Sequence, residues 1–142
     1  DMATHKVTFR VYYEDTDAGG IVYHARYLGF AERARGEAMR AVDASVMELL
    51  NDFGLCFVVR QASLRYRAPL RLDDLMEIET ALIEMTPARL KLCQTIRNAG
   101  GERETAVVVD VELACLRAAD MKPAKIPPRW RDAIQKLEAG EA

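Results

Sequence analysis

An acidic turn near the N-terminus contains the residue types best suited to chemistry. From Tyr12 to His24 the sequence reads YYEDTDAGGIVYH, in which three carboxylates lie beside two adjacent glycines. Glycine and aspartate favour tight turns, and helical periodicity follows this turn at once. A carboxylate beside a helix start can act as a base, and the unpaired N–H groups of the first helical turn attract developing negative charge. Catalysis is therefore expected in this stretch.

The helix that must position this turn is the most amphipathic segment of the sequence. Apolar residues recur at helical spacing at Tyr27, Phe30, Ala31, Ala34, Ala38 and Val42. Arg33 and Glu37 flank this stripe four residues apart, so they are expected to pair in solvent. The spacing predicts one long helix with a buried face.

Strands account for most of the remaining chain. Residues 5–12, 75–85 and 89–97 alternate apolar and polar side chains, as does the second half of 55–67, which is typical of half-buried strands. Residues 106–116 are apolar at almost every position, which predicts a central strand covered on both faces.

Two short helices are expected as well. Ser45 with Glu48 fits a capping box, and Gly54 suits the end of the helix that follows. Pro127 and Pro128 suit a helix start. The second short helix is therefore expected over residues 130–137.

The order of elements predicts an α+β fold in a single domain that covers residues 1–142. A strand and a long helix come first, and four long strands follow in what reads as an antiparallel meander. One sheet wrapping one long helix satisfies this order, and a chain of this length can bury a real core. The exposed sheet edge favours dimerisation across that edge.

Composition argues against several classes of function. The formal net charge of −2 gives no reason to expect a nucleic-acid partner. No apolar run approaches the roughly 18 residues of a membrane-spanning helix, and the stretch DMATHKVTF lacks the apolar centre of a secretory signal. Cys56, Cys93 and Cys115 are too widely spaced for a metal site or a disulfide framework, and they are expected to be small buried residues. These features predict a cytoplasmic protein without a bound metal.

The acidic turn and the first half of the helix resemble a known signature. Residues 12–30 are similar to the signature of the hotdog-fold acyl-CoA thioesterases of the 4-hydroxybenzoyl-CoA thioesterase type. They look most like the YbgC branch, whose genes commonly accompany the Tol-Pal envelope system. The family's Y-x-E-D-T-D segment is met by Tyr12, Glu14, Asp15, Thr16 and Asp17, and its G-x-V-Y-H-x-x-Y segment by Gly20, Val22, Tyr23, His24 and Tyr27. The rest of the chain is similar in outline.

The resemblance implies a hotdog fold, in which a curved antiparallel sheet of about five strands wraps a long central helix. It also implies a homodimer or homotetramer with active sites at the subunit interfaces, an acyl-CoA substrate, and no cofactor apart from the coenzyme A of that substrate. The aspartate of the family's T-D-x-x-G segment corresponds to Asp17. The N–H group that polarises the substrate carbonyl corresponds to the backbone of His24.

Asp17 is the expected catalytic residue, as a nucleophile that forms a mixed anhydride or as a base that deprotonates water. The N–H groups of His24 and Tyr23 would hold the carbonyl oxygen as it becomes negative. The His24 imidazole is a second catalytic candidate, although composition alone fits a structural histidine equally well. By residue type, Asp17 could instead be a turn residue that caps the helix. Glu14 and Asp15 are expected to be solvated or to stabilise the turn.

Aromatic and basic residues are the candidates for substrate binding. Tyr13, Tyr23 and Tyr27 could line an acyl pocket, with ordinary packing as the alternative. Coenzyme A carries phosphates, so Arg89 and Lys91 are candidate phosphate ligands, with an ordinary charged sheet face as the alternative. Similar candidates are Arg60, Arg65, Arg67 and Arg97.

Other hypotheses compete with hydrolysis by Asp17. A hotdog dehydratase presents a histidine and an acidic residue together, which Asp17 and His24 could imitate. A non-catalytic scaffold would bind acyl-CoA without releasing a thiol. Some hotdog thioesterases use a glutamate on the central helix, but Glu32 is expected to project about 140° from the buried stripe and so to face away from the sheet. The sequence leaves the length of the acyl chain open.

Overall fold

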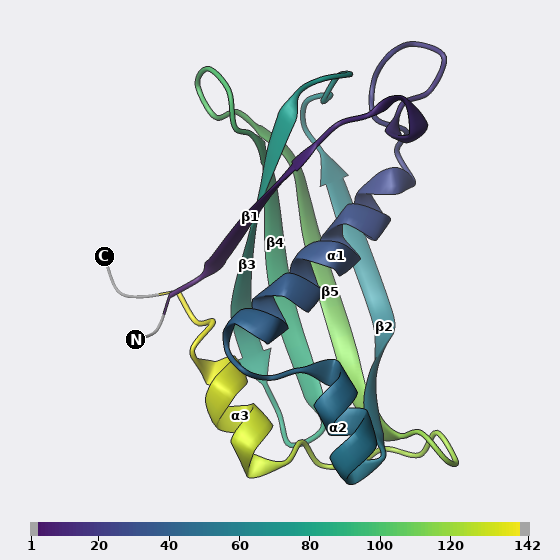
Figure 1. The fold of residues 1–142 in the computed structure, drawn as a ribbon, viewed down its shortest axis with the longest axis vertical. Coiled ribbons are helices and arrows are strands. Elements are labelled where there is room, and N and C mark those ends of the chain that lie inside the picture. Colours follow the sequence, from purple (N-terminus) through teal and green to yellow (C-terminus); the bar gives the residue numbers. More distant parts are fainter. Residues whose placement is uncertain (1–2, 140–142) are drawn as a thin grey trace.

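The computed structural model describes residues 3–139 and contains one sheet with helices on one of its faces (Figure 1). In chain order the elements are β1 (His5–Arg10), the 3₁₀ turn η1 (Tyr13–Asp15), α1 (Arg26–Ala41), α2 (Val46–Phe53), β2 (Leu55–Tyr66), β3 (Leu75–Met85), β4 (Arg89–Asn98), β5 (Thr105–Arg117) and α3 (Pro128–Gln135). The predicted α+β layout of a long helix against a five-stranded antiparallel sheet is confirmed.

The strand order is β1-β3-β4-β5-β2, so the predicted four-strand meander is wrong in one connection. β3, β4 and β5 do form a meander, but β2 pairs with β5 instead of β3. The segment after β2 crosses the end of the sheet, where the N–H of Arg67 donates to the Ala106 carbonyl and Leu70 is fully buried. Apolar periodicity indicates which face of a strand is buried, but it does not say which strand is its neighbour.

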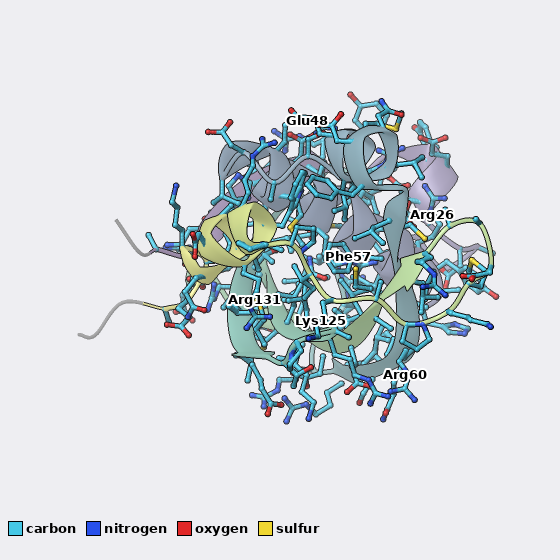
Figure 2. All side chains as sticks on the ribbon, turned by 90° about the horizontal axis from the view of Figure 1, so that it is seen from below. Arg26, Glu48, Phe57, Arg60, Lys125 and Arg131 are labelled. Carbon is cyan, nitrogen blue, oxygen red and sulfur yellow. The ribbon has the colours of Figure 1, made fainter. Side chains whose placement is uncertain are left out.

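β5 is an interior strand, but only one of its faces is covered by helices, which corrects the prediction that both are covered. On its other face Glu112 pairs with Arg60 at 3.4 Å and Asp110 with Arg65 at 3.6 Å. Figure 2, seen from below, shows Phe57 directed into the space between helices and sheet and Arg60 directed away from it. The apolar sequence of β5 therefore goes with its interior position, between β4 and β2, and not with helices on both faces.

The predicted stripe of α1 is buried against the sheet, with Tyr27, Phe30, Ala31, Ala34 and Ala38 all at most 5% exposed. The small alanines let the helix axis approach the strands closely, which favours dense packing. The predicted pair of Arg33 with Glu37 is replaced by a pair of Glu37 with Arg40 at 2.9 Å.

A buried amide ties α1 to the centre of the sheet. The Gln94 side chain, 0% exposed in β4, donates to the Ala31 carbonyl at 2.9 Å and to the Thr80 hydroxyl at 3.0 Å. Its oxygen accepts from the Arg35 guanidinium at 3.0 Å. Because every polar atom of this amide has a partner, its burial is not penalised.

The short helices follow their predicted signals. The Ser45 hydroxyl accepts from the N–H of Glu48 at 3.4 Å, but the Glu48 carboxylate pairs with Arg129 at 2.8 Å, so only half of the predicted capping box forms. Gly54 ends α2 with φ +64° as predicted. α3 begins at the predicted proline pair and buries Trp130. Within residues 3–139, no helix has both the length and the apolar character needed to cross a membrane.

All three cysteines are free, and each lies in a strand. Cys115 is buried, and burial raises the pKa of its thiol to about 11. Cys56 and Cys93 are only partly buried, so the prediction of core burial holds for Cys115 alone.

Candidate active site

Asp15 anchors the acidic turn to the start of α1. Its side chain is 5% exposed and accepts from Arg26 at 2.5 Å and from the N–H of Tyr12 at 2.9 Å. Its backbone carbonyl accepts from the N–H of Tyr23 at 2.9 Å. Of the two roles predicted for Asp15, the structure shows that it stabilises the turn and is not solvated.

Asp17 lies at the tip of a tight loop that this anchor supports. Its N–H donates to the Ile21 carbonyl at 2.9 Å, and its carboxylate accepts from the N–H of Gly19 at 2.8 Å. A Cβ atom on Gly19 would lie 3.2 Å from the same carboxylate oxygen, and Gly20 has φ +80°, so both glycines suit this loop. The loop thus holds the carboxylate in one orientation.

The Asp17 carboxylate is exposed, and no cationic side chain among residues 3–139 forms an ion pair with it. Asp17 does not cap α1, because the N-cap is Ala25 and no side chain bonds to the first helical turn there. The alternative that Asp17 caps the helix is therefore wrong, although its side chain does stabilise its own turn.

Several backbone N–H groups at the start of α1 have no hydrogen-bond acceptor within residues 3–139, including those of Tyr27 and Leu28 in the first helical turn. Within residues 3–139, the N–H groups of His24 and Ala25 have no hydrogen-bond acceptor. The N–H of Tyr23 is already bound to the Asp15 carbonyl, which corrects its predicted availability for a substrate oxygen. His24 and Ala25 supply free donors just before the first helical residue, and Ala25 was not foreseen from the sequence.

Tyr66, the last residue of β2, reaches this helix start from a distant part of the chain. Its hydroxyl donates to the His24 carbonyl at 2.9 Å, and its ring lies edge-on to Tyr27 at 5.9 Å and to the His24 imidazole at 6.4 Å. The sequence placed Tyr66 on a strand face but gave no sign of this contact, because the two partners are 42 residues apart.

The three predicted acyl-pocket tyrosines have different environments. Tyr27 is 3% exposed, and burial raises the pKa of its phenol. Tyr27 is thus a packing residue, as the alternative proposed. Tyr23 is 46% and Tyr13 83% exposed, with the Tyr23 ring 4.6 Å from the His24 ring.

Among the basic candidates, Arg65, Arg67 and Arg97 lie at the same end of the sheet as Tyr66, whereas Arg89 lies toward the opposite end. Ile96 and Tyr66 both pair with Val107 of β5, so they lie at the same height in the sheet. Arg89 is seven residues from Ile96 along β4, which corresponds to about 23 Å. Lys91 lies on the same face and pairs with Glu84 at 3.3 Å. A single chain therefore does not bring Arg89 or Lys91 to Asp17.

A groove of about 1000 Å³ lies between α1, α2 and β2, along the open edge of the sheet. Its wall includes Met47 and Leu50 of α2 and Phe57 and Val59 of β2. Met47 and Val59 are 58% and 50% exposed, so apolar surface faces solvent in the single chain. We call this surface, formed by α1, α2 and β2, the edge groove.

No cluster of three His, Cys, Asp or Glu side chains within residues 3–139 is arranged to hold a metal ion. Glu32 is exposed, as predicted, and lines the edge groove instead of the space beneath α1.

Comparisons with known proteins place the chain in a family. Residues 11–134 match the model of the thioesterase-like superfamily. The chain is 44% identical to the acyl-CoA thioester hydrolase YbgC of Escherichia coli over 83% of this chain and 86% of that protein. It is 40% identical to the acyl-CoA thioesterase YbgC of Haemophilus influenzae over 91% and 93% of the two chains.

A solved structure agrees with these relatives. The probable thioesterase from Bartonella henselae superposes with a TM-score of 0.81 at 34% identity, covering 88% of this chain and all of that one. The resemblance seen in residues 12–30 and the hotdog fold it implied are thereby confirmed. The chain belongs to the thioesterase-like superfamily of hotdog-fold hydrolases, in which its similarity to the YbgC proteins extends over most of its length.

Proposed function

We propose that this protein is an acyl-CoA thioesterase that hydrolyses its substrate to a free acid and coenzyme A. The observation that carries the proposal is the exposed Asp17 carboxylate, which has no ion-pair partner within residues 3–139. The base of its loop also holds the N–H groups of His24 and Ala25, which have no acceptor in the same part of the chain. Relatives with up to 44% identity are named acyl-CoA thioester hydrolases, which supports the same substrate class here.

Hydrolysis can follow either of two balanced routes from Asp17. As a nucleophile, the carboxylate adds to the thioester carbonyl and expels the coenzyme A thiolate, and water then cleaves the resulting anhydride. As a base, it takes a proton from water while the hydroxide adds to the carbonyl, and that proton then neutralises the leaving thiolate. In both routes the His24 and Ala25 N–H groups donate to the oxygen as it becomes negative, and the His24 ring positions the water or the leaving group.

The edge groove supports the proposal of a homodimer. β2 is an edge strand, and two copies related by a two-fold axis would pair their β2 strands antiparallel. That pairing sets the Leu55 end of one β2 beside the Tyr66 end of the other. The second copy would then bring its edge groove to the Asp17 turn as a wall for the acyl chain.

The same pairing gives the basic candidates a role. Arg89 is level with Val58, near the Leu55 end of β2, and Lys91 is level with Gln61 in its middle. A second copy paired antiparallel would therefore carry its own Arg89 toward the Asp17 end of the first. Cations at the mouth of the site would bind the phosphates of coenzyme A. Tyr13 and Tyr23 would then line the site under cover of the second copy.

A charge in the edge groove is expected to break this assembly. Val59→Arg places like charges near the two-fold axis, so we expect a shift toward monomer and about tenfold slower thiol release. Light scattering after size exclusion and a thiol assay check both effects. Ile83→Arg, at a 62% exposed position on β3 outside the groove, is the matched control. A fully active Val59→Arg monomer would contradict an interfacial site.

The activity itself is tested by thiol release from short aliphatic, long aliphatic and aromatic acyl-CoA substrates. We expect release from at least one class without an added metal or redox cofactor. Tight binding with no thiol release from any substrate would instead favour the scaffold function. Formation of an unsaturated product from a 3-hydroxyacyl substrate would favour the dehydratase.

Free cysteines fit a cytoplasmic location, and the Tol-Pal association implied by the sequence resemblance stays a prediction.

A further inference from the structure

The hydroxyl of Tyr66 holds the carbonyl of His24, and no other donor among residues 3–139 bonds to that oxygen. This carbonyl belongs to the same planar peptide group as the N–H of Ala25, and the two bonds point in opposite directions. A donor that fixes the carbonyl therefore also fixes the direction of the Ala25 N–H.

This peptide group is the central one of a β-turn. The N–H of Arg26 donates to the Tyr23 carbonyl at 2.8 Å, which closes a turn over residues 23–26. Ala25 has φ −76° and ψ −16°, so the turn is of type I. Rotation of the central peptide would give a type II turn, in which the carbonyl takes the place of the N–H and Ala25 needs a positive φ.

Two features oppose that rotation. A positive φ costs alanine about 1–2 kcal/mol, and rotation would also break the hydrogen bond from Tyr66. Tyr66 is itself held in place, because its backbone lies in the β2–β5 ladder opposite Val107 and its ring packs on the buried Tyr27. The sheet thus sets the position of the hydroxyl that orients the helix start.

We propose that Tyr66 is a positioning residue, whose hydroxyl orients the 24–25 peptide so that the N–H of Ala25 points at the oxygen of the bound thioester. This inference rests on the proposed function, since it assigns the free amides to the substrate carbonyl. Tyr66 acts through the backbone and does not touch the reacting atoms. A donor aligned before substrate binds needs no reorganisation during the reaction.

Tyr66→Phe tests the proposal because it removes the hydroxyl and keeps the ring. We expect kcat to fall about tenfold and KM to stay within about twofold of the parent value. The reason is that the aligned Ala25 N–H stabilises the oxygen mainly in the transition state, when it becomes negative. The melting temperature should change little, because the ring contacts remain. Tyr12→Phe, at a 62% exposed position whose hydroxyl forms no hydrogen bond within residues 3–139, is the matched control.

A second measurement needs no substrate. The carbonyl carbon of His24, followed by NMR in the free protein, should shift in Tyr66→Phe and stay unchanged in Tyr12→Phe. Parental kcat in Tyr66→Phe would overturn the proposal, and so would a defect confined to KM, which would mean a substrate contact. Parent protein and Asp17→Asn are assayed alongside: a parent that releases no thiol defeats the proposed function, whereas an active parent with a parental Tyr66→Phe defeats only this inference.

Discussion

Asp17→Asn is expected to release thiol from acyl-CoA at least about 100-fold more slowly than the parent, because an amide is neither a nucleophile nor a base at neutral pH. The substitution keeps the size of the side chain and an oxygen that can accept from the N–H of Gly19. Because Asp17 is exposed, the substitution does not disturb the core, and the melting temperature should stay within a few degrees of the parent.

Steady-state kinetics with saturating acyl-CoA measure this effect as a loss in kcat. Glu14→Gln is the matched control, since Glu14 is an exposed carboxylate of the same turn and should keep parental turnover. Equal losses in both variants would indicate a general effect of charge in the turn. That result would remove the specific role of Asp17.

Asp15→Asn should show the reverse pattern, with a large loss of stability. The carboxylate is 5% exposed and carries both the Arg26 pair and the Tyr12 N–H. An amide can point only one oxygen at these donors, so Arg26 loses its charged partner. We expect the free energy of unfolding to fall by about 2–3 kcal/mol, below the usual loss for a buried pair because Arg26 is 42% exposed and can regain water.

Urea denaturation of parent and variant measures this loss as a lower midpoint at constant slope. Asp52→Asn, an exposed position on α2, is the control and should stay within about 0.5 kcal/mol of the parent. A parental midpoint for Asp15→Asn would mean that the ion pair with Arg26 does not hold the turn.

Local signals in the sequence predicted the elements well. The stripe from Tyr27 to Ala38, the Ser45 cap and the Gly54 stop each depend on residues a few positions apart, and each appears in the structure. The prediction of the strand order was wrong because β2 pairs with β5, which joins residues about 50 positions apart. Apolar periodicity carries no information about such distant partners.

The site was predictable only where its chemistry is local. Glu14, Asp15 and Asp17 look alike in the sequence, and only a tertiary partner, Arg26, shows that Asp15 is structural. The free N–H of Ala25 carries no side-chain signal. Tyr66 joins the site through strand β2, and the edge groove arises where three elements meet, so neither could be read from spacing.

Hydrolysis at this site requires one thioester carbonyl to meet both Asp17 and the N–H groups of His24 and Ala25. The most direct test is a structure of Asp17→Asn with an intact acyl-CoA bound. We predict that the carbonyl oxygen lies about 3 Å from at least one of these two backbone nitrogens. We also predict that the side chain of residue 17 lies within about 3.5 Å of the carbonyl carbon or of a water that contacts it. A thioester bound away from this turn, with residue 17 in solvent, would contradict both predictions.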